Sequence, residues 1–175
     1  MVKKTGGLSV PIMLTCLFLL GASRPAMAEN GLSRETLRGL KALNVQVAPI
    51  EPGISHEGLT HKRILEDTKR ELQKAGIELL SDEEFTRLRR SRSYPLGRLE
   101  MMITIKDAGS SDAKIYSTTV RVRQAVFLSR RPVIKVFAPT WEKRTIGYTR
   151  DLGPVAEAVR NGVEQFIRDY LSVNP

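Results

Sequence analysis

The spacing of the apolar residues changes several times along this chain, and the order of these changes limits the folds that it can adopt. Apolar and polar residues alternate over 43–47, as in a half-buried strand. Apolar residues then follow a helical spacing over 64–75, where charged residues take the other side. Thr60 is a good N-cap for this helix, and Gly76 is suited to end it. A second strand follows at 77–80, so the two strands are expected to be parallel with a right-handed crossover.

The next part of the chain predicts a short helix and three consecutive strands. Ser81 and Glu84 have the spacing of a capping box, which opens a helix that buries Phe85 and Leu88. Alternation of apolar and polar residues then returns in three stretches, at 99–106, 114–128 and 133–141. Turns are expected between them, at 107–112 and 130–132. Consecutive strands of this kind form an antiparallel meander.

The carboxy-terminal stretch carries the clearest helical stripe, from Val155 to Tyr170, with Asp151 as the expected cap and Pro154 in the first turn. Together these elements predict an α+β fold with a mixed five-stranded sheet. A strand–helix–strand unit would be followed by the three-stranded meander, with two long helices packed on one face. With helices on one side alone, the other face would be wet or would pair with a partner.

The amino-terminal stretch, residues 1–28, has the pattern of a Sec-type signal peptide. Two lysines precede an apolar run over about residues 8–20. Ala26 and Ala28 supply the small side chains that signal peptidase requires. We therefore expect cleavage after Ala28, which leaves Glu29 as the first residue of a periplasmic or secreted protein.

A retained membrane anchor and a lipoprotein leader are the alternatives for this stretch. Its apolar run is shorter than the roughly 20 residues that span a bilayer, which disfavours an anchor. Cys16 follows Thr15, whereas a lipid-attachment cysteine normally follows Gly or Ala, and this disfavours lipidation. We expect no stable transmembrane segment after processing.

Processing would leave residues 29–175 as a single α+β domain, long enough for one core without disulfides. The whole chain has 28 basic and 19 acidic residues and a formal net charge of +9. Removing Lys3, Lys4 and Arg24 lowers the net charge to +6. Cleavage also removes the chain's single cysteine, which excludes disulfides, a thiolate nucleophile and cysteine-ligated metal sites.

The sequence offers few residues for catalysis. Its two histidines, His56 and His61, stand five positions apart, whereas two zinc-binding histidines on a helix stand four apart. The sequence has no nucleophile elbow and no Gly-rich phosphate loop. We expect no enzyme, no cofactor and no metal. The alternative is a small hydrolase or metal-dependent enzyme in which both imidazoles converge with Glu57 or Asp67.

Arginine is the remaining chemical feature, because guanidinium groups hold phosphate and carboxylate groups in bidentate fashion. The candidate anion-binding residues are Arg87, Arg89, Arg90, Arg92, Arg98, Arg121, Arg123, Arg130 and Arg131. For an exported protein the expected anions are phospholipid headgroups, lipopolysaccharide, cell-wall polymers or an acidic protein face. The alternative is that these arginines only solvate a loop and the polar face of a strand and pair with Glu83, Glu84, Glu100 and Asp112. Nucleic acid is disfavoured, since the net charge is modest and the compartment is wrong.

Trp141, at the end of the last predicted strand, is open to two interpretations. An aromatic side chain on a sheet rim can be a ligand platform, but it more often closes the core. The sequence leaves the oligomeric state open as well, and self-association through the uncovered sheet face is a further alternative.

Several of these segments together carry a resemblance to a known family. They are the charged helix at 60–77, the long strand at 117–128, the Thr-Trp-Glu at 140–142 and the ending F-x-x-D-Y-L-x-V-N-P at 166–175. They are similar to a family of small exported bacterial proteins without an assigned activity; the arginine-rich stretch at 87–98 departs from the family pattern. The order of elements also resembles the amino-terminal domain of TolB. The resemblance implies export and no particular activity, because similarity of fold alone says little about function. From the lack of catalytic motifs and from the arginines, we expect a non-catalytic periplasmic binding or adaptor domain whose partner is an envelope protein or an anionic envelope polymer or lipid.

Overall fold

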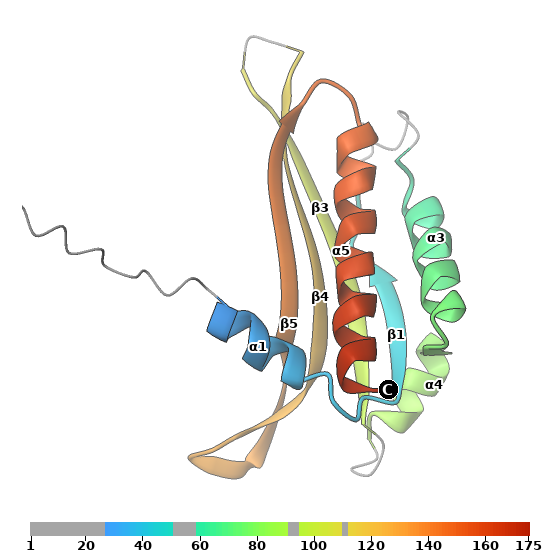
Figure 1. Ribbon diagram of the computed structural model, residues 1–175, viewed down its shortest axis with the longest axis vertical. Coiled ribbons are helices and arrows are strands. Elements are labelled where there is room, and N and C mark those ends of the chain that lie inside the picture. Colours follow the sequence, from blue (N-terminus) through green and yellow to red (C-terminus); the bar gives the residue numbers. More distant parts are fainter. Residues whose placement is uncertain (1–26, 51–58, 91–94, 110–111) are drawn as a thin grey trace, which may run out of the picture.

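The structure is a computed structural model that describes residues 27–50, 59–90, 95–109 and 112–175. Figure 1 shows its elements in chain order. They are α1 (Met27–Glu35), β1 (Ala42–Val47), α3 (His61–Lys74), β2 (Glu78–Leu80), α4 (Asp82–Leu88), β3 (Leu96–Asp107), β4 (Lys114–Leu128), β5 (Arg131–Thr149) and α5 (Gly153–Val173).

The five strands form one mixed sheet in the order β2-β1-β3-β4-β5. Strand β1 is parallel to both β2 and β3, whereas β3, β4 and β5 form an antiparallel meander. The predicted α+β fold and its mixed five-stranded sheet are confirmed. The caps of α3 are also confirmed, because the Thr60 hydroxyl accepts a hydrogen bond from the Arg63 amide and Gly76 has a φ of 74°.

The two long helices, α3 and α5, lie on the same face of the sheet (Figure 1). Alternate residues of β3 and β4 point toward them, and Met101, Val120 and Phe166 are at most 1% exposed. Gly162 brings α5 close to the sheet, because a Cβ at this position would lie 2.6 Å from Val120 Cγ2. This layer contains the main core.

The prediction that helices lie on one face alone is wrong, because α4 packs on the opposite face. Phe85 is fully buried there in a second small core with Ala42, Leu80 and Leu96. These strand residues face away from α3 and α5. Ala42 and Leu96 are paired in the register, and along their strands they point to the opposite side from Leu43 and Leu99, which face the helices. Part of this outer face is therefore covered.

Three further expectations need correction. The sequence predicts no element at α1, yet the structure has a helix there, followed by the buried Leu37 and Leu40. Strand β5 extends to Thr149, because backbone pairing with β4 continues past the predicted end. The N-cap of α5 is Leu152; the Asp151 carboxylate instead accepts a hydrogen bond from the Gly153 amide at 2.8 Å.

Strands β4 and β5 continue as a hairpin beyond the rest of the sheet (Figure 1). The pairing of β3 with β4 begins at Gly97 opposite Gln124, so residues 125–128 pair with β5 alone. Arg131 pairs with Leu128, which places the turn at Ser129 and Arg130. The turn therefore begins one residue earlier than in the predicted turn, 130–132. The pairing is irregular between Phe127 and Leu128.

Candidate functional site

The structure separates the candidate arginines into two groups. Five are exposed at the carboxyl end of α4, just after it, and on the β4–β5 hairpin: Arg87, Arg89, Arg90, Arg130 and Arg131. Three are partly buried on the outer face of the sheet: Arg98, Arg121 and Arg123. Arg92 lies outside the described residues. The expectation of one continuous arginine surface is therefore replaced by an exposed group and an internal network.

Helix α4 places its arginines at one end because its cap fixes where it starts. The Ser81 hydroxyl accepts a hydrogen bond from the Glu84 amide at 3.2 Å, and the Glu84 carboxylate accepts one from the Ser81 amide at 2.9 Å. This is the predicted capping box. Acidic residues fill the first turn and basic residues follow the last, which suits the helix dipole. The result is a cluster of arginines at the carboxyl end of the helix.

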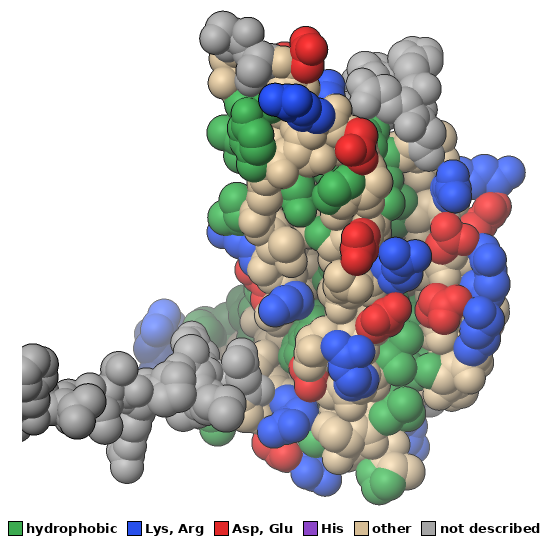
Figure 2. All heavy atoms as spheres, turned by 45° about the horizontal axis from the view of Figure 1, so that its top comes forward, with side chains coloured by type: hydrophobic (Ala, Val, Ile, Leu, Met, Phe, Trp, Pro, Cys, Tyr) green, Lys and Arg blue, Asp and Glu red, His purple; other side chains and the backbone are tan. Residues whose placement is uncertain are grey.

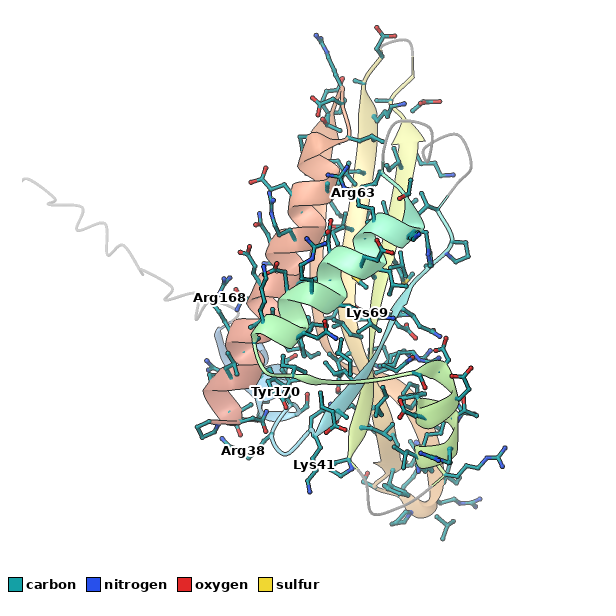
Figure 3. The ribbon with its side chains drawn as sticks, turned by 90° about the vertical axis from the view of Figure 1, so that its right-hand side faces the viewer. Arg38, Lys41, Arg63, Lys69, Arg168 and Tyr170 are labelled. Carbon is teal, nitrogen blue, oxygen red and sulfur yellow. The ribbon has the colours of Figure 1, made fainter. Side chains whose placement is uncertain are left out.

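The carboxyl end of α4 is joined to the hairpin. The Phe85 ring meets the Phe137 ring edge to face, with centroids 6.0 Å apart, and the Lys135 ammonium donates a hydrogen bond to the Arg89 carbonyl at 3.4 Å. Figures 1 and 3 both show α4 and the hairpin at the same end of the molecule. We call this region the cationic end; it comprises Arg87, Arg89, Arg90, Arg130, Arg131 and Lys135.

Arg98 fastens α4 to the sheet. Its guanidinium lies 4.5 Å from the Phe85 ring centroid, and its Nε donates a hydrogen bond to Asn44 Oδ1 at 2.9 Å. The amide of Asn44 donates in turn to the Asp82 carboxylate at 3.0 Å. Burial lowers the pKa of the Arg98 guanidinium, and nearby Glu100 and Asp82 act in the opposite direction. These contacts indicate a supporting role for Arg98.

Glu100 holds the other two sheet arginines. Its carboxylate accepts hydrogen bonds from Arg121 at 2.9 Å and from Arg123 at 3.4 Å. Arg123 also donates to the Phe137 carbonyl at 2.7 Å and lies over the Phe137 ring at 5.3 Å, while its Nε is buried without a hydrogen-bond partner. Neighbouring strands place these groups side by side, since Glu100 pairs with Arg121 in the register. For Arg121 and Arg123, the alternative that they pair with a carboxylate is confirmed.

The tip of the hairpin combines positive charge with exposed apolar side chains. Phe127 is 53% exposed and Val133 is 88% exposed, and both are close in sequence to Arg130 and Arg131. Ile134 and Val136 are also exposed. The sequence between Asp112 and Glu142 contains no acidic residue. The basic residues of the tip therefore lie among exposed apolar side chains.

A second concave site lies between α3 and α5. This groove has a volume of about 800 Å³ and an apolar floor that includes Ile64, Val159 and Val163. Arg63 stands on its rim (Figure 3). Five carboxylates and two guanidinium groups line it, and Figure 2 shows charges of both signs mixed over the helices. The balance of charge in the groove disfavours an anionic ligand.

The structure describes one of the two histidines, His61. His61 is exposed at the start of α3, and its Nε2 lies 3.0 Å from the Val47 carbonyl, to which it donates. His56 and Glu57 lie outside the described residues. Among residues 27–50, 59–90, 95–109 and 112–175, no group of three His, Cys, Asp or Glu side chains is placed to hold a metal ion.

Trp141 belongs to the core. It is 4% exposed, its ring meets the Phe166 ring at 5.4 Å, and its Nε1 donates a hydrogen bond to the Asp169 carboxylate at 2.9 Å. Of its two interpretations, the structural one is therefore confirmed. The indole links β5 to α5.

The predicted signal peptide lies largely outside the described residues, as do Cys16 and Ala26. The backbone at Ala28 and Glu29 forms part of α1. In the part of the chain that is described, no helix has the length and apolar character needed to cross a membrane.

Sequence reasoning missed two features. One is the set of exposed apolar residues on the hairpin, and the other is the groove between α3 and α5. Absence of acidic residues over 113–141 was a signal for the hairpin, since it leaves the basic residues there without carboxylates close in sequence. The groove depends on the spacing of two helices far apart in sequence, which local periodicity does not specify.

Comparison with known proteins found similarity to a solved structure. No family model and no curated protein matches the chain. A solved structure, a minor lipoprotein from Acinetobacter baumannii, is similar over 76% of this chain and 92% of that chain, with 12% sequence identity and a TM-score of 0.37. Similarity at this level carries no conclusion about the function of this chain.

Proposed function

We propose that this chain is an exported, non-catalytic binding or adaptor domain of the cell envelope, and that its cationic end binds an anionic envelope component. One observation carries the proposal: five exposed arginines and Lys135 meet at one end of the molecule, on two elements that contact each other. Arginine suits this role because its planar guanidinium matches phosphate and carboxylate groups.

The exposed arginines are available for binding. Among the described residues, the ion pairs on the outer face use Arg121 and Arg123, and none uses an arginine of the cationic end. After the hydrogen bonds from Ser81, Arg87 is a further cause of the lowered pKa of the Glu84 carboxyl, whereas the other basic residues of the cationic end raise the local concentration of anions. Arg98 adds to this field from beneath, since it is held against Phe85.

A rigid support favours binding, because little conformational entropy is lost when the ligand arrives. The Phe85–Phe137 contact and the bond from Lys135 to the Arg89 carbonyl hold α4 against the hairpin. The Glu100 carboxylate fixes Arg121 and Arg123 on the same outer face of the sheet. We therefore propose that the sheet arginines support the cationic end and that the exposed arginines bind the ligand.

The test is retention of the purified protein on anionic material. Wild-type protein is expected to bind phosphatidylglycerol vesicles or isolated cell-wall sacculi and to be released by salt, because exposed charges are screened within about 10 Å at 0.1 M. The double variant Arg90→Glu and Arg131→Glu should lose this retention. The matched control is Lys69→Glu with Arg168→Glu, which makes the same change in net charge on α3 and α5 (Figure 3).

Two results would overturn the proposal. One is unchanged retention of the Arg90→Glu and Arg131→Glu variant on both materials. The other is an equal loss in the control variant, since this would show that net charge alone decides retention.

A further inference from the structure

The hairpin tip carries chemistry that the proposed function does not use. Four of its apolar side chains are exposed, from 38% for Ile134 to 88% for Val133. Binding of a phosphate group or of a polar cell-wall polymer gains nothing from these side chains, because such ligands offer no apolar phase in which to bury them.

These apolar groups occupy both surfaces of the hairpin. The register pairs Val126 with Val136 and the next residue, Phe127, with Lys135, so Val136 and Phe127 point in opposite directions. Both are exposed, at 40% and 53%. A protein partner covers one surface of a hairpin, whereas a lipid layer surrounds an inserted tip on all sides.

Basic residues lie at the turn and beside the tip, so only a shallow insertion keeps their charged groups within reach of the lipid headgroups. Arg130 and Arg131 are at the turn, Lys135 is on the returning strand, and the arginines of α4 lie alongside. Long basic side chains reach the headgroup layer while their aliphatic parts stay in an apolar region. Anionic lipid attracts such a cluster by about fivefold in binding for each charge near the surface.

We propose that the tip of the β4–β5 hairpin, residues 127–136, inserts into the interface of an anionic lipid bilayer, with the cationic end on the headgroups. Insertion is shallow, on the scale of about 5–10 Å that amphipathic segments reach. This inference rests on the proposed function and identifies its anionic component as a membrane surface.

The experiment measures the polarity around one labelled position at a time, either in the hairpin tip or at a control position outside it. The processed protein, residues 29–175, contains no cysteine, so that a cysteine introduced at position 133 can be labelled alone with a polarity-sensitive nitrobenzoxadiazole dye. The control label replaces Ile146, which is also an exposed β5 residue, at 68% exposure, but lies outside the hairpin tip. Both labelled proteins are mixed with phosphatidylglycerol vesicles or phosphatidylcholine vesicles.

We expect a blue shift and a several-fold rise in fluorescence at position 133 on phosphatidylglycerol vesicles, and no change at position 146. On phosphatidylcholine the response at 133 should be much weaker. In co-sedimentation, Arg130→Ser with Arg131→Ser should weaken vesicle binding about 25-fold, from about fivefold per charge. Phe127→Ser with Val133→Ser should weaken it at least tenfold, because each substitution removes an apolar side chain that insertion would bury.

Other outcomes overturn the inference in different ways. If the protein sediments with anionic vesicles through its arginines but position 133 stays in water, insertion is refuted and the proposed function stands. If the protein fails to bind vesicles but binds sacculi through the same arginines, the ligand is a polymer. If position 133 responds to protein concentration without lipid, the tip binds a second copy of this chain. Loss of binding to both materials refutes both proposals.

Discussion

Replacing Phe85 by alanine tests whether α4 is held to the outer face as the structure indicates. The Phe85 side chain is fully buried, meets the Phe137 ring at 6.0 Å and carries the Arg98 guanidinium at 4.5 Å. Truncation of a buried phenylalanine costs about 3–5 kcal/mol, and loss of the aromatic pair accounts for about 0.5–1.5 kcal/mol. We therefore expect a decrease of about 4 kcal/mol in the free energy of unfolding.

The assay is urea unfolding of the Phe85→Ala variant, followed by circular dichroism. With a slope of about 2 kcal/mol/M, the midpoint should fall by about 2 M. Phe127→Ala is the matched control, since Phe127 is 53% exposed and its truncation should change stability by less than about 0.5 kcal/mol. A midpoint shift below about 0.5 M for Phe85→Ala would refute the second core.

Three other predictions concern the support and the packing of the sheet. Glu100→Gln should lower the free energy of unfolding by about 2 kcal/mol in the same assay, because it leaves two partly buried guanidinium groups without their carboxylate. A loss below about 0.5 kcal/mol would contradict the pairing of Glu100 with Arg121 and Arg123. Gly162→Ala should cost about 1–3 kcal/mol, because its Cβ would lie 2.6 Å from a Val120 methyl, and a neutral or stabilising effect in thermal unfolding would contradict this contact. Hydrogen bonds from Ser81 lower the pKa of Glu84 below its ordinary value, so the stabilisation of α4 by the Glu84 carboxylate is present at higher pH and is lost as pH falls through the lowered pKa. An NMR titration should show this loss in the α4 amides, and Glu84→Gln should remove it.

The elements with local signals were predicted well. Thr60 and the Ser81–Glu84 capping box mark the starts of α3 and α4, and Gly76 follows the end of α3 with the positive φ that glycine allows. The observed β4, Lys114–Leu128, has the predicted bounds, because its apolar alternation continues along its whole length. Caps and alternation act within a few residues, so a sequence displays them directly.

The elements that depend on distant contacts were missed. Helix α1 has no apolar stripe, and the side chains of Ser33 and Thr36 donate to the Thr140 carbonyl more than a hundred residues away. The second half of β5 begins with three consecutive charged residues, 142–144, which break the alternation, and it is held by its backbone pairing with β4. In both cases tertiary contact outweighs local preference.

The candidate site was predicted in composition but not in arrangement. The sequence identifies the arginines and places Arg121 and Arg123 on one face of a strand, yet the partner that neutralises both, Glu100, comes from a neighbouring strand through the register. The projecting hairpin follows from where the pairing with β3 begins, at Gly97. Strand register is set by the whole sheet, so this division between supporting and exposed arginines required the structure.

The most direct test of the central claim is to map where an anion binds on the folded protein. Isotope-labelled protein is titrated with dihexanoyl phosphatidylglycerol below its micelle concentration, and amide shifts are followed by NMR. We predict that the perturbed amides lie at residues 87–90 and 128–136. Perturbation centred instead on the groove between α3 and α5, or equal small shifts over the whole surface, would contradict an anion-binding role for the cationic end.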